Sequence, residues 1–189
     1  MDEPHAQPAA ISKSRLEMLF DGVFAIAMTI LVLELKVPDL VAQRSAPELA
    51  HALRHEAATF LSYLLSFTVL GVFWFRHNTQ YRHYHTITGG VLALHFVQLA
   101  AAASFPFGAA LWGHYPLNPL SVVIYLAPVL VYAWASFAGW LVARRTGAFS
   151  PGMAESTYRR VRKRGLFSCL FISALFVVWI VDKFVLAQG

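Results

Sequence analysis

The sequence predicts an all-α protein, a polytopic bundle of transmembrane helices, and its composition is the first reason. Of the 189 residues, 58% are hydrophobic and only 13% are charged, and the mean hydropathy is +0.56. These values are too apolar for an ordinary soluble domain of this size. Inside a bilayer every peptide group needs a partner within the protein, so spans are helices or strands of a closed barrel. The long apolar runs lack the alternation of barrel strands, which leaves helices.

The second reason is the number and length of the apolar runs. Five of them approach the roughly 20 residues that cross the hydrocarbon layer as a helix. They are residues 18–37, 57–75, 87–107, 121–142 and 166–186. We expect these five spans to form one transmembrane domain, residues 15–189, behind a polar cytoplasmic leader, residues 1–14. No small-residue cleavage site follows the leader, so the first run is expected to be a retained span rather than a signal peptide.

The basic residues indicate how the chain is oriented. With the N-terminus in the cytoplasm, eleven lysines and arginines lie on the inner side and four on the outer side, a bias typical of cytoplasmic loops. The inner residues are Lys13, Arg15, Arg76, Arg82, Arg144, Arg145, Arg159, Arg160, Arg162, Lys163 and Arg164, and the outer ones are Lys36, Arg44, Arg54 and Lys183. We therefore expect a multi-pass protein of the cell inner membrane with a cytoplasmic N-terminus. The odd number of spans places the C-terminus outside.

A basic run just before the fifth span accounts for part of the net charge of +5. It consists of Arg159, Arg160, Arg162, Lys163 and Arg164. A cluster in this position attracts anionic lipid headgroups by about 1 kcal/mol per basic residue. Alternatively, it serves only as a topology signal. Both interpretations explain the charge by the membrane, so no nucleic-acid partner is expected.

Signatures of catalysis and of metal binding are weak. Cys169 is the single cysteine and lies inside the fifth span, which excludes an intrachain disulfide and a cysteine metal cluster. A membrane metal protein stays an alternative, because His51 and His55 are spaced i, i+4 and three more histidines lie near the inner interface. Those three are His77, His83 and His85. No HExxH-like motif or nucleophile elbow is present, so we expect neither an enzyme nor a bound cofactor.

The first span is the most informative. Its uncharged core, residues 22–33, is only 12 residues long and is bracketed by Asp21 and Glu34. Acidic side chains near membrane depth usually face protein or water, which makes this helix a candidate for a pore wall or for the centre of a bundle. In the alternative interpretation, both carboxylates sit at the two interfaces and cap a short, ordinary span.

Helical geometry sorts the residues between the two acids. At about 100° per residue, Ile26, Ile30 and Leu33 fall on one stripe at i, i+4 and i+7, with Thr29 beside it. Ala25 and Val32 lie elsewhere on the helix. Repeated around a symmetry axis, the stripe would form rings of branched side chains that close a pore by expelling water, and a ring of threonine hydroxyls could partly coordinate an ion. An aliphatic stripe on a membrane helix is also what packing or lipid contact produces.

The stretch from Arg15 to Leu35 resembles the first helix of the bacterial branch of the transmembrane protein 175 potassium channels. The signature of that family is Arg-x-x-x-Phe-Ser-Asp followed by a long apolar helix. Arg15 and Asp21 match it in position and spacing, whereas Leu19-Phe20 replaces the Phe-Ser pair. The segment from Trp74 to His77 is similar to a Trp-x-x-His element of the second helix. The resemblance is specific over about twenty residues at the front and only hydropathic beyond residue 84.

The resemblance implies a homotetramer in which four first helices line the pore. The residue five past the signature Asp, here Ile26, would form the hydrophobic constriction, and Ile30 and Leu33 would form the next rings outward. Thr29 falls where bacterial members have a threonine linked to cation selectivity. A structural polar network would comprise Arg15, Asp21, Trp74 and His77. Family members have six spans per unit, whereas five are recognised here.

The expected function is a potassium-permeable, modestly selective cation channel that also admits sodium. Copies of Glu34 and Asp39 at the outer mouth, with Asp21 inside, would raise the local cation concentration, although Lys36 partly offsets this. No Thr-Val-Gly-Tyr-Gly loop is present, so strong selectivity from rings of backbone carbonyls is not expected. A different class of function stays open. The serine replaced by Phe20 and the missing span are also compatible with a non-conducting assembly or scaffold protein that keeps the channel fold.

Overall fold

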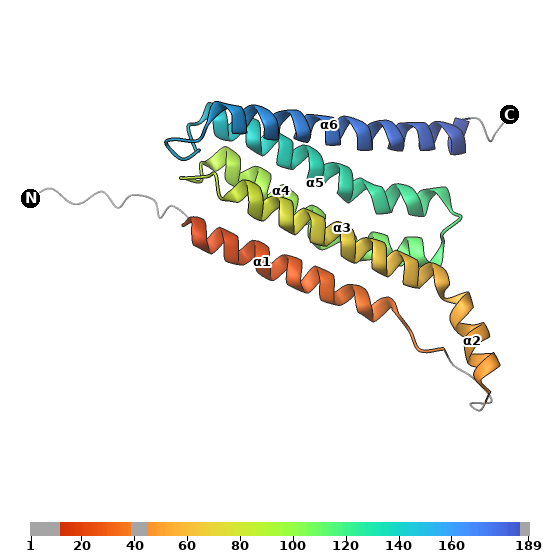
Figure 1. Ribbon diagram of the computed structural model, residues 1–189. Coiled ribbons are helices and arrows are strands. Elements are labelled where there is room, and N and C mark those ends of the chain that lie inside the picture. Colours follow the sequence, from red (N-terminus) through yellow and green to blue (C-terminus); the bar gives the residue numbers. More distant parts are fainter. Residues whose placement is uncertain (1–11, 39–44, 186–189) are drawn as a thin grey trace, which may run out of the picture.

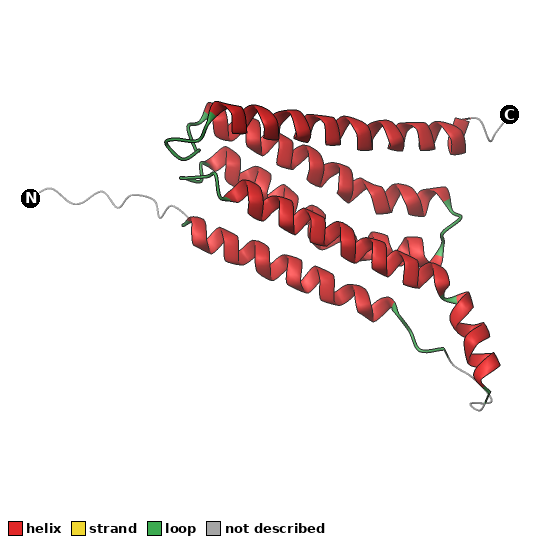
Figure 2. Ribbon diagram, viewed as in Figure 1, coloured by secondary structure: helices red, strands yellow, loops and turns green. Residues whose placement is uncertain are grey.

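The computed structural model describes residues 12–38 and 45–185 as a bundle of long helices (Figure 1). The helices are α1 (Lys13–Ile30), α2 (Ala46–His55), α3 (Ala57–Tyr81), α4 (Gly89–His114), α5 (Pro119–Arg145) and α6 (Glu155–Ile180). A 3₁₀ turn, Leu31–Glu34, continues α1, and a π-helical turn, Val181–Val185, continues α6. No strand occurs in the described ranges, where loops alone join the helices (Figure 2).

Five of these helices are long and apolar enough to cross a membrane, which confirms the predicted number of spans. All but α2 qualify. The start of α1 and the end of α6 lie at opposite ends of the bundle, as an odd number of crossings requires (Figure 1). The chain is therefore a multi-pass membrane protein.

The ends of the spans differ from those that we predicted. Helix α1 begins at Lys13 rather than at residue 18, α3 continues to Tyr81 rather than to residue 75, and α6 begins at Glu155 rather than at residue 166. The reason is that helices continue through the polar interface, whereas an apolar run marks only the hydrocarbon layer. Helix α1 ends at Ile30 and its 3₁₀ continuation ends at Glu34, before the predicted end at residue 37. Pro38 has no backbone N–H, so an α-helix could not have continued through it.

Side-chain caps explain where several helices begin. Ser12 caps α1 by accepting a hydrogen bond from the backbone N–H of Arg15 (3.4 Å). Ser45 caps α2 in the same way, with the N–H of Glu48 as donor. Such caps satisfy one of the four backbone donors that a helix start leaves unpaired. Residues 1–11 of the predicted leader lie outside the described residues, and the helix takes up the leader's last two positions.

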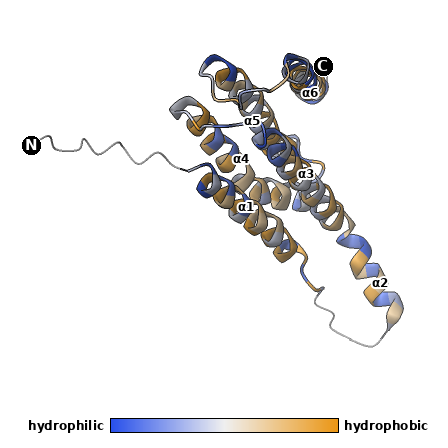
Figure 3. Cartoon of the chain, turned by 60° about the vertical axis from the view of Figure 1, so that its left-hand side comes forward, coloured by the Kyte–Doolittle hydropathy of each residue, from blue (hydrophilic) through white to orange (hydrophobic). Residues whose placement is uncertain are grey.

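The short helix α2 was not among the predicted elements. It is amphipathic, with a first-turn Glu48 and a last-turn Arg54 and His55 that complement the helix dipole. Its surface mixes hydrophilic and hydrophobic residues (Figure 3), and none of its residues is buried. A ten-residue helix of this kind suits the membrane interface, and a search for long apolar runs does not detect it.

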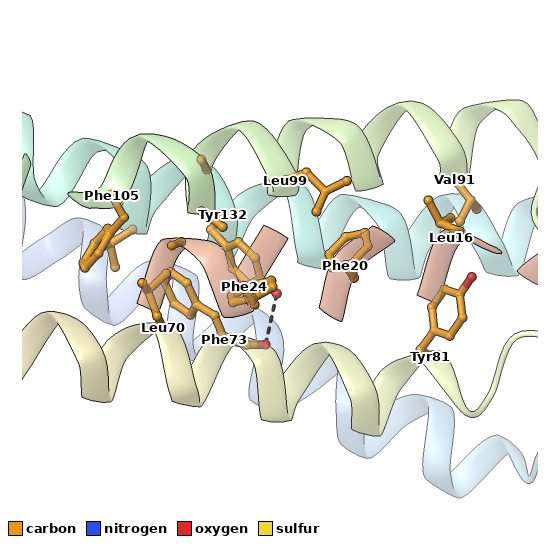
Figure 4. Close-up of a cluster of buried hydrophobic side chains, with 14 of the residues drawn as sticks. Leu16, Phe20, Phe24, Leu70, Phe73, Tyr81, Val91, Leu99, Phe105 and Tyr132 are labelled. Atoms are coloured by element: carbon orange, nitrogen blue, oxygen red, sulfur yellow. Dashed lines mark hydrogen bonds between the residues drawn. The ribbon is translucent and has the colours of Figure 1, made fainter. Parts of the chain in front are cut away.

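The core lies where α1 packs against α3 and α4, and α6 packs on α5 on the opposite side of the bundle (Figure 1). Phenylalanine and tyrosine rings pack among leucine, valine and alanine side chains in the core (Figure 4). The rings of Phe73 and Tyr132 stack with centroids 4.0 Å apart, and the Tyr132 hydroxyl donates a 3.0 Å hydrogen bond to the Phe73 carbonyl. Gly108 lets α4 approach α5 closely, since a Cβ there would lie 3.0 Å from the Tyr125 Cα.

Candidate pore helix and its anchors

Helix α1 and the 3₁₀ turn that continues it have a narrow packed face and a wider uncovered one. The side that packs against α3 and α4 consists of residues spaced by three or four positions, all nearly inaccessible: Leu16, Phe20, Phe24, Ala27 and Leu31. At about 100° per residue these side chains form one stripe. They hold the helix against the bundle and leave its opposite side uncovered by this chain.

The predicted pore residues lie on the uncovered face. Ile26 is 60% exposed, Ile30 41% and Leu33 70%, and Thr29 between them is also exposed. Exposure of a contiguous apolar face this size requires lipid or another protein chain to cover it. The structure thus brings the four predicted residues together on one side of one helix.

The uncovered face is wider than the predicted stripe. Ala25 is exposed too, and Val32 is 47% exposed, although both were expected to lie elsewhere on the helix. Ala25 and Val32 are rotated by about 100° and 120° from Ile26, so the angular assignment stands while the exposed sector extends past them. The physical reason is that α1 contacts its own subunit along only one side.

The Thr29 hydroxyl donates its hydrogen bond to the backbone of its own helix. The hydroxyl oxygen lies 2.9 Å from the carbonyl oxygen of Ala25 and 3.0 Å from that of Ile26, and it donates toward them. Threonine in a membrane helix commonly satisfies its donor in this way. Because the hydrogen is occupied by the backbone, the oxygen lone pairs stay available as acceptors, which is the arrangement that a cation ligand needs.

Asp21 is tied to the second span. Its carboxylate accepts a 2.8 Å hydrogen bond from the indole N–H of Trp74, which joins α1 to α3. Arg15 is exposed, and its guanidinium forms no hydrogen bond or ion pair with any residue in the described part of the chain. Two members of the predicted polar network, Asp21 and Trp74, are therefore in contact within one subunit.

His77 lies one turn along α3 from Trp74 and is buried in the core. Its ring stacks flat on Phe20, with centroids 3.6 Å apart and planes 6° from parallel, and its buried Nε2 has no hydrogen-bond partner among the described residues. His95 approaches the same pair edge-on. The structure does not bring His77 into contact with Asp21. The residue that replaces the signature serine is thus the one that packs against His77.

Lys13 anchors the start of α1, and the sequence analysis missed it. Its ammonium donates a 2.7 Å hydrogen bond to the Tyr84 carbonyl and lies 5.3 Å from the centre of the Tyr81 ring. The Tyr81 hydroxyl donates in turn to the Lys13 carbonyl (2.8 Å). Burial, with Tyr81 close by, raises the pKa of Tyr84 above its usual range, so its hydroxyl stays protonated. No spacing rule reveals partners about 70 residues apart.

The remaining predicted residues are Glu34, Asp39 and the histidines at positions 51 and 55. Glu34 is half-buried and lines a small cleft beside Thr59 and Ser62 rather than the uncovered face of α1. Asp39 lies outside the described residues. His51 and His55 lie side by side on α2, with ring centroids 4.6 Å apart. Within the described ranges, no group of three or more potential metal ligands occurs.

Comparisons with known proteins identify the family. The family model described as endosomal/lysosomal potassium channel TMEM175 matches residues 15–106. A potassium channel of Streptomyces collinus is 30% identical over 156 residues, which cover 79% of this chain and 74% of that protein. A potassium channel of a Chryseobacterium species is 32% identical over 113 residues, 59% of this chain and 55% of that protein.

Vertebrate proteins match over a smaller share of their length. The human endosomal/lysosomal proton channel TMEM175 is 33% identical over 118 residues, which cover 55% of this chain but only 23% of the human protein. The fold is similar to a crystal structure described as a lysosomal potassium-selective channel TMEM175 homologue from Chamaesiphon minutus. The TM-score is 0.76 at 24% identity, over 89% of this chain and 87% of the other.

The region matched by the family model begins at Arg15, the first residue of the stretch that resembles the family. The family is one of ion channels for potassium transport, which confirms the prediction that the chain is not an enzyme. Because the similarity to the Streptomyces protein extends over most of both chains, the conclusion does not depend on one motif. The chain belongs to the TMEM175 family of channels.

Proposed function

We propose that four copies of this chain form a cation channel whose pore is lined by the uncovered face of α1. The observation that carries the proposal is the two-faced helix. One face is fixed against α3 and α4, and the other presents Ile26, Thr29 and Leu33 to whatever lies next to the subunit. One such helix cannot enclose a pore, so copies must meet around an axis. The number four rests on the family resemblance.

The proposed conduction path alternates dry and polar rings. Rings of Ile26, Ile30 and Leu33 would form a narrow hydrophobic constriction that stops ions by expelling water. The Thr29 ring between them would offer acceptor oxygens, four in a tetramer, to a partly dehydrated cation. Potassium is the proposed main ion, with sodium also admitted, because the bacterial relatives are named potassium channels and hydroxyl rings discriminate only modestly.

The proposed orientation puts the N-terminus in the cytoplasm of a bacterial inner membrane. Its support is that one end of the bundle collects the start of α1, the end of α3, the end of α5 and the start of α6 (Figure 1). These segments carry most of the described basic residues, including Lys13, Arg76 and Arg144. Cytoplasmic ends of membrane helices show this excess.

The substitution Ile26→Asn tests the constriction. A polar side chain of similar size should wet the ring, so potassium and sodium flux into liposomes should rise by at least about tenfold. Val32→Asn is the matched control, since it adds the same group to an exposed position about 120° around the helix and should leave flux within about twofold. Thr29→Val should preserve flux and reduce the preference for potassium over sodium.

The oligomeric state must be measured with the flux. Size-exclusion chromatography with light scattering should give a protein mass four times the 21.0 kDa of the chain. If Ile26→Asn tetramers leave liposomes as tight as protein-free ones, the constriction is not where we propose. A monomer would contradict the assembly itself.

A non-conducting assembly protein is the second candidate, and one contact favours it. Phe20 occupies the place of the signature serine and stacks on His77, whose Nε2 finds no hydrogen-bond partner in the part of the chain that the structure describes. A hydroxyl at that position would have been able to bond with it. Flux through the unmodified protein separates the two candidates, because a channel conducts and a scaffold does not.

A further inference from the structure

An apolar cleft with two arginines lies between α3 and α6. It is formed by the last turns of α3 and the first half of α6, and it holds about 390 Å³. Arg76 of α3 and Arg164 of α6 line it, together with Phe75 and Phe167. Gly165 is at its base, where a side chain would meet the Phe137 ring 3.2 Å away. A volume of this size accommodates a small ligand or a lipid headgroup.

The two arginines carry positive charge that the described residues do not neutralise. No carboxylate in the described ranges lies within 4.0 Å of either guanidinium. Other basic residues of this region do have partners, since Arg144 and Arg159 both pair with Glu155. Each guanidinium offers five N–H donors in a planar fork that matches a phosphate group. Two guanidiniums from two helices that line one cleft offer the donors that an anionic group needs.

The apolar side chains around the two arginines suit a lipid ligand better than a soluble anion. Phe75 is 65% exposed and Phe167 is 70% exposed, and both flank the cleft. Helix α6 packs on α5 and lies opposite α1 (Figure 1), so in the proposed channel this surface faces the bilayer. The arginines are at the basic end of the bundle, where the headgroup layer of the cytoplasmic leaflet would be.

We propose that this cleft binds an anionic phospholipid. Its headgroup phosphate would lie between Arg76 and Arg164, and its acyl chains would run along Phe75 and Phe167. The site differs from a general attraction to the basic run of α6, because one of its two cations comes from α3 and the remaining basic residues of that run do not line the cleft. It concerns lipid binding, so it does not depend on whether the protein conducts ions.

Native mass spectrometry of the full chain in detergent tests the site with added phosphatidylglycerol and phosphatidylcholine. The unmodified protein should retain phosphatidylglycerol more strongly. The double variant Arg76→Gln/Arg164→Gln should bind it at least about tenfold more weakly. The control Arg160→Gln/Lys163→Gln removes the same charge from exposed positions of α6 outside the cleft and should change binding by less than about twofold.

Each contrary result overturns the proposal. Equal losses of phosphatidylglycerol binding in the two double variants would show diffuse attraction to the basic run. Equal retention of the two lipids would show that the site does not distinguish an anionic headgroup from a zwitterionic one. Displacement of bound lipid by millimolar inorganic phosphate would show a site for a free anion. If the double variant does not stay monodisperse, Arg164→Gln alone decides, because Arg164 is exposed on the outermost helix and its loss should still weaken binding about threefold or more.

Discussion

The hydrogen bond between Trp74 and Asp21 should be a principal attachment of α1 to the rest of the subunit. Trp74→Phe removes the indole N–H but keeps an aromatic ring in the same place. The carboxylate of Asp21 then loses a 2.8 Å donor near the membrane interface. Uncompensated carboxylates are costly at that depth, so the loss should exceed that of a neutral hydrogen bond.

The size of the effect follows from a matched pair in the same protein. Trp74 is 39% exposed and bonds to a carboxylate, whereas Trp134 is 40% exposed and donates a 3.1 Å bond to the hydroxyl of Ser173. Hydrogen bonds to charged groups contribute about 1.5–3 kcal/mol and neutral ones about 0.5–1.5 kcal/mol. Because both tryptophans are partly exposed, we take the lower end of each range. The expected loss of unfolding free energy is about 1.5 kcal/mol for Trp74→Phe and about 0.5 kcal/mol for Trp134→Phe.

Thermal melting in detergent, followed by circular dichroism, measures both variants. At about 2–4 °C per kcal/mol for a chain of this length, Tm should fall by about 3–6 °C for Trp74→Phe and by about 1–2 °C for Trp134→Phe. Asp21→Ala should lower Tm by a similar amount as Trp74→Phe, and the double variant should add little, since both remove one bond. Equal Tm shifts for the two tryptophans, or additive shifts in the cycle, would refute the reasoning.

Two further predictions concern packing and anchoring. Gly108→Ala should lower Tm by an amount equivalent to about 1–3 kcal/mol, because its Cβ would meet backbone atoms of α5 at 3.0 Å, whereas Gly89→Ala has open space and should change Tm little. Lys13→Gln should lose the hydrogen bond to the Tyr84 carbonyl and speed amide hydrogen exchange in the first turns of α1. Lys36→Gln, at an exposed position, should leave that exchange unchanged. Equal exchange rates in the two variants would show that Lys13 does not anchor the start of α1.

Hydropathy predicted the number of spans because a crossing helix needs a long apolar run whatever its neighbours are. Hydropathy does not show where the helices end, because it marks only the part of each helix that lies in the hydrocarbon layer. Lys13 and Arg76 lie inside helices that continue through the interface, where charged side chains are tolerated. Helix α2 escaped detection for the converse reason, since a short amphipathic helix has no long apolar run.

The candidate site was predictable where it depends on one helix. Periodicity places Ile26, Ile30 and Leu33 on one side of α1, and the structure leaves that side uncovered. Contacts between helices were not predictable in the same way. The stacking of Phe20 on His77 joins residues more than 50 positions apart, and no local pattern indicates which aromatic meets which.

Cysteine accessibility along α1 tests the pore-lining face most directly. Single cysteines would be introduced into a Cys169→Ser background, reconstituted in liposomes and treated with a water-soluble, positively charged thiol reagent. We expect modification to reduce potassium flux at least about tenfold at positions of the uncovered face and less than about twofold at positions of the packed face. The uncovered positions are Gly22, Ile26, Thr29 and Leu33, and the packed ones are Phe24, Ala27 and Leu31. If a cysteine at position 26 reacts only with a membrane-permeant maleimide and its modification leaves flux unchanged, this face of α1 contacts lipid and does not line the pore.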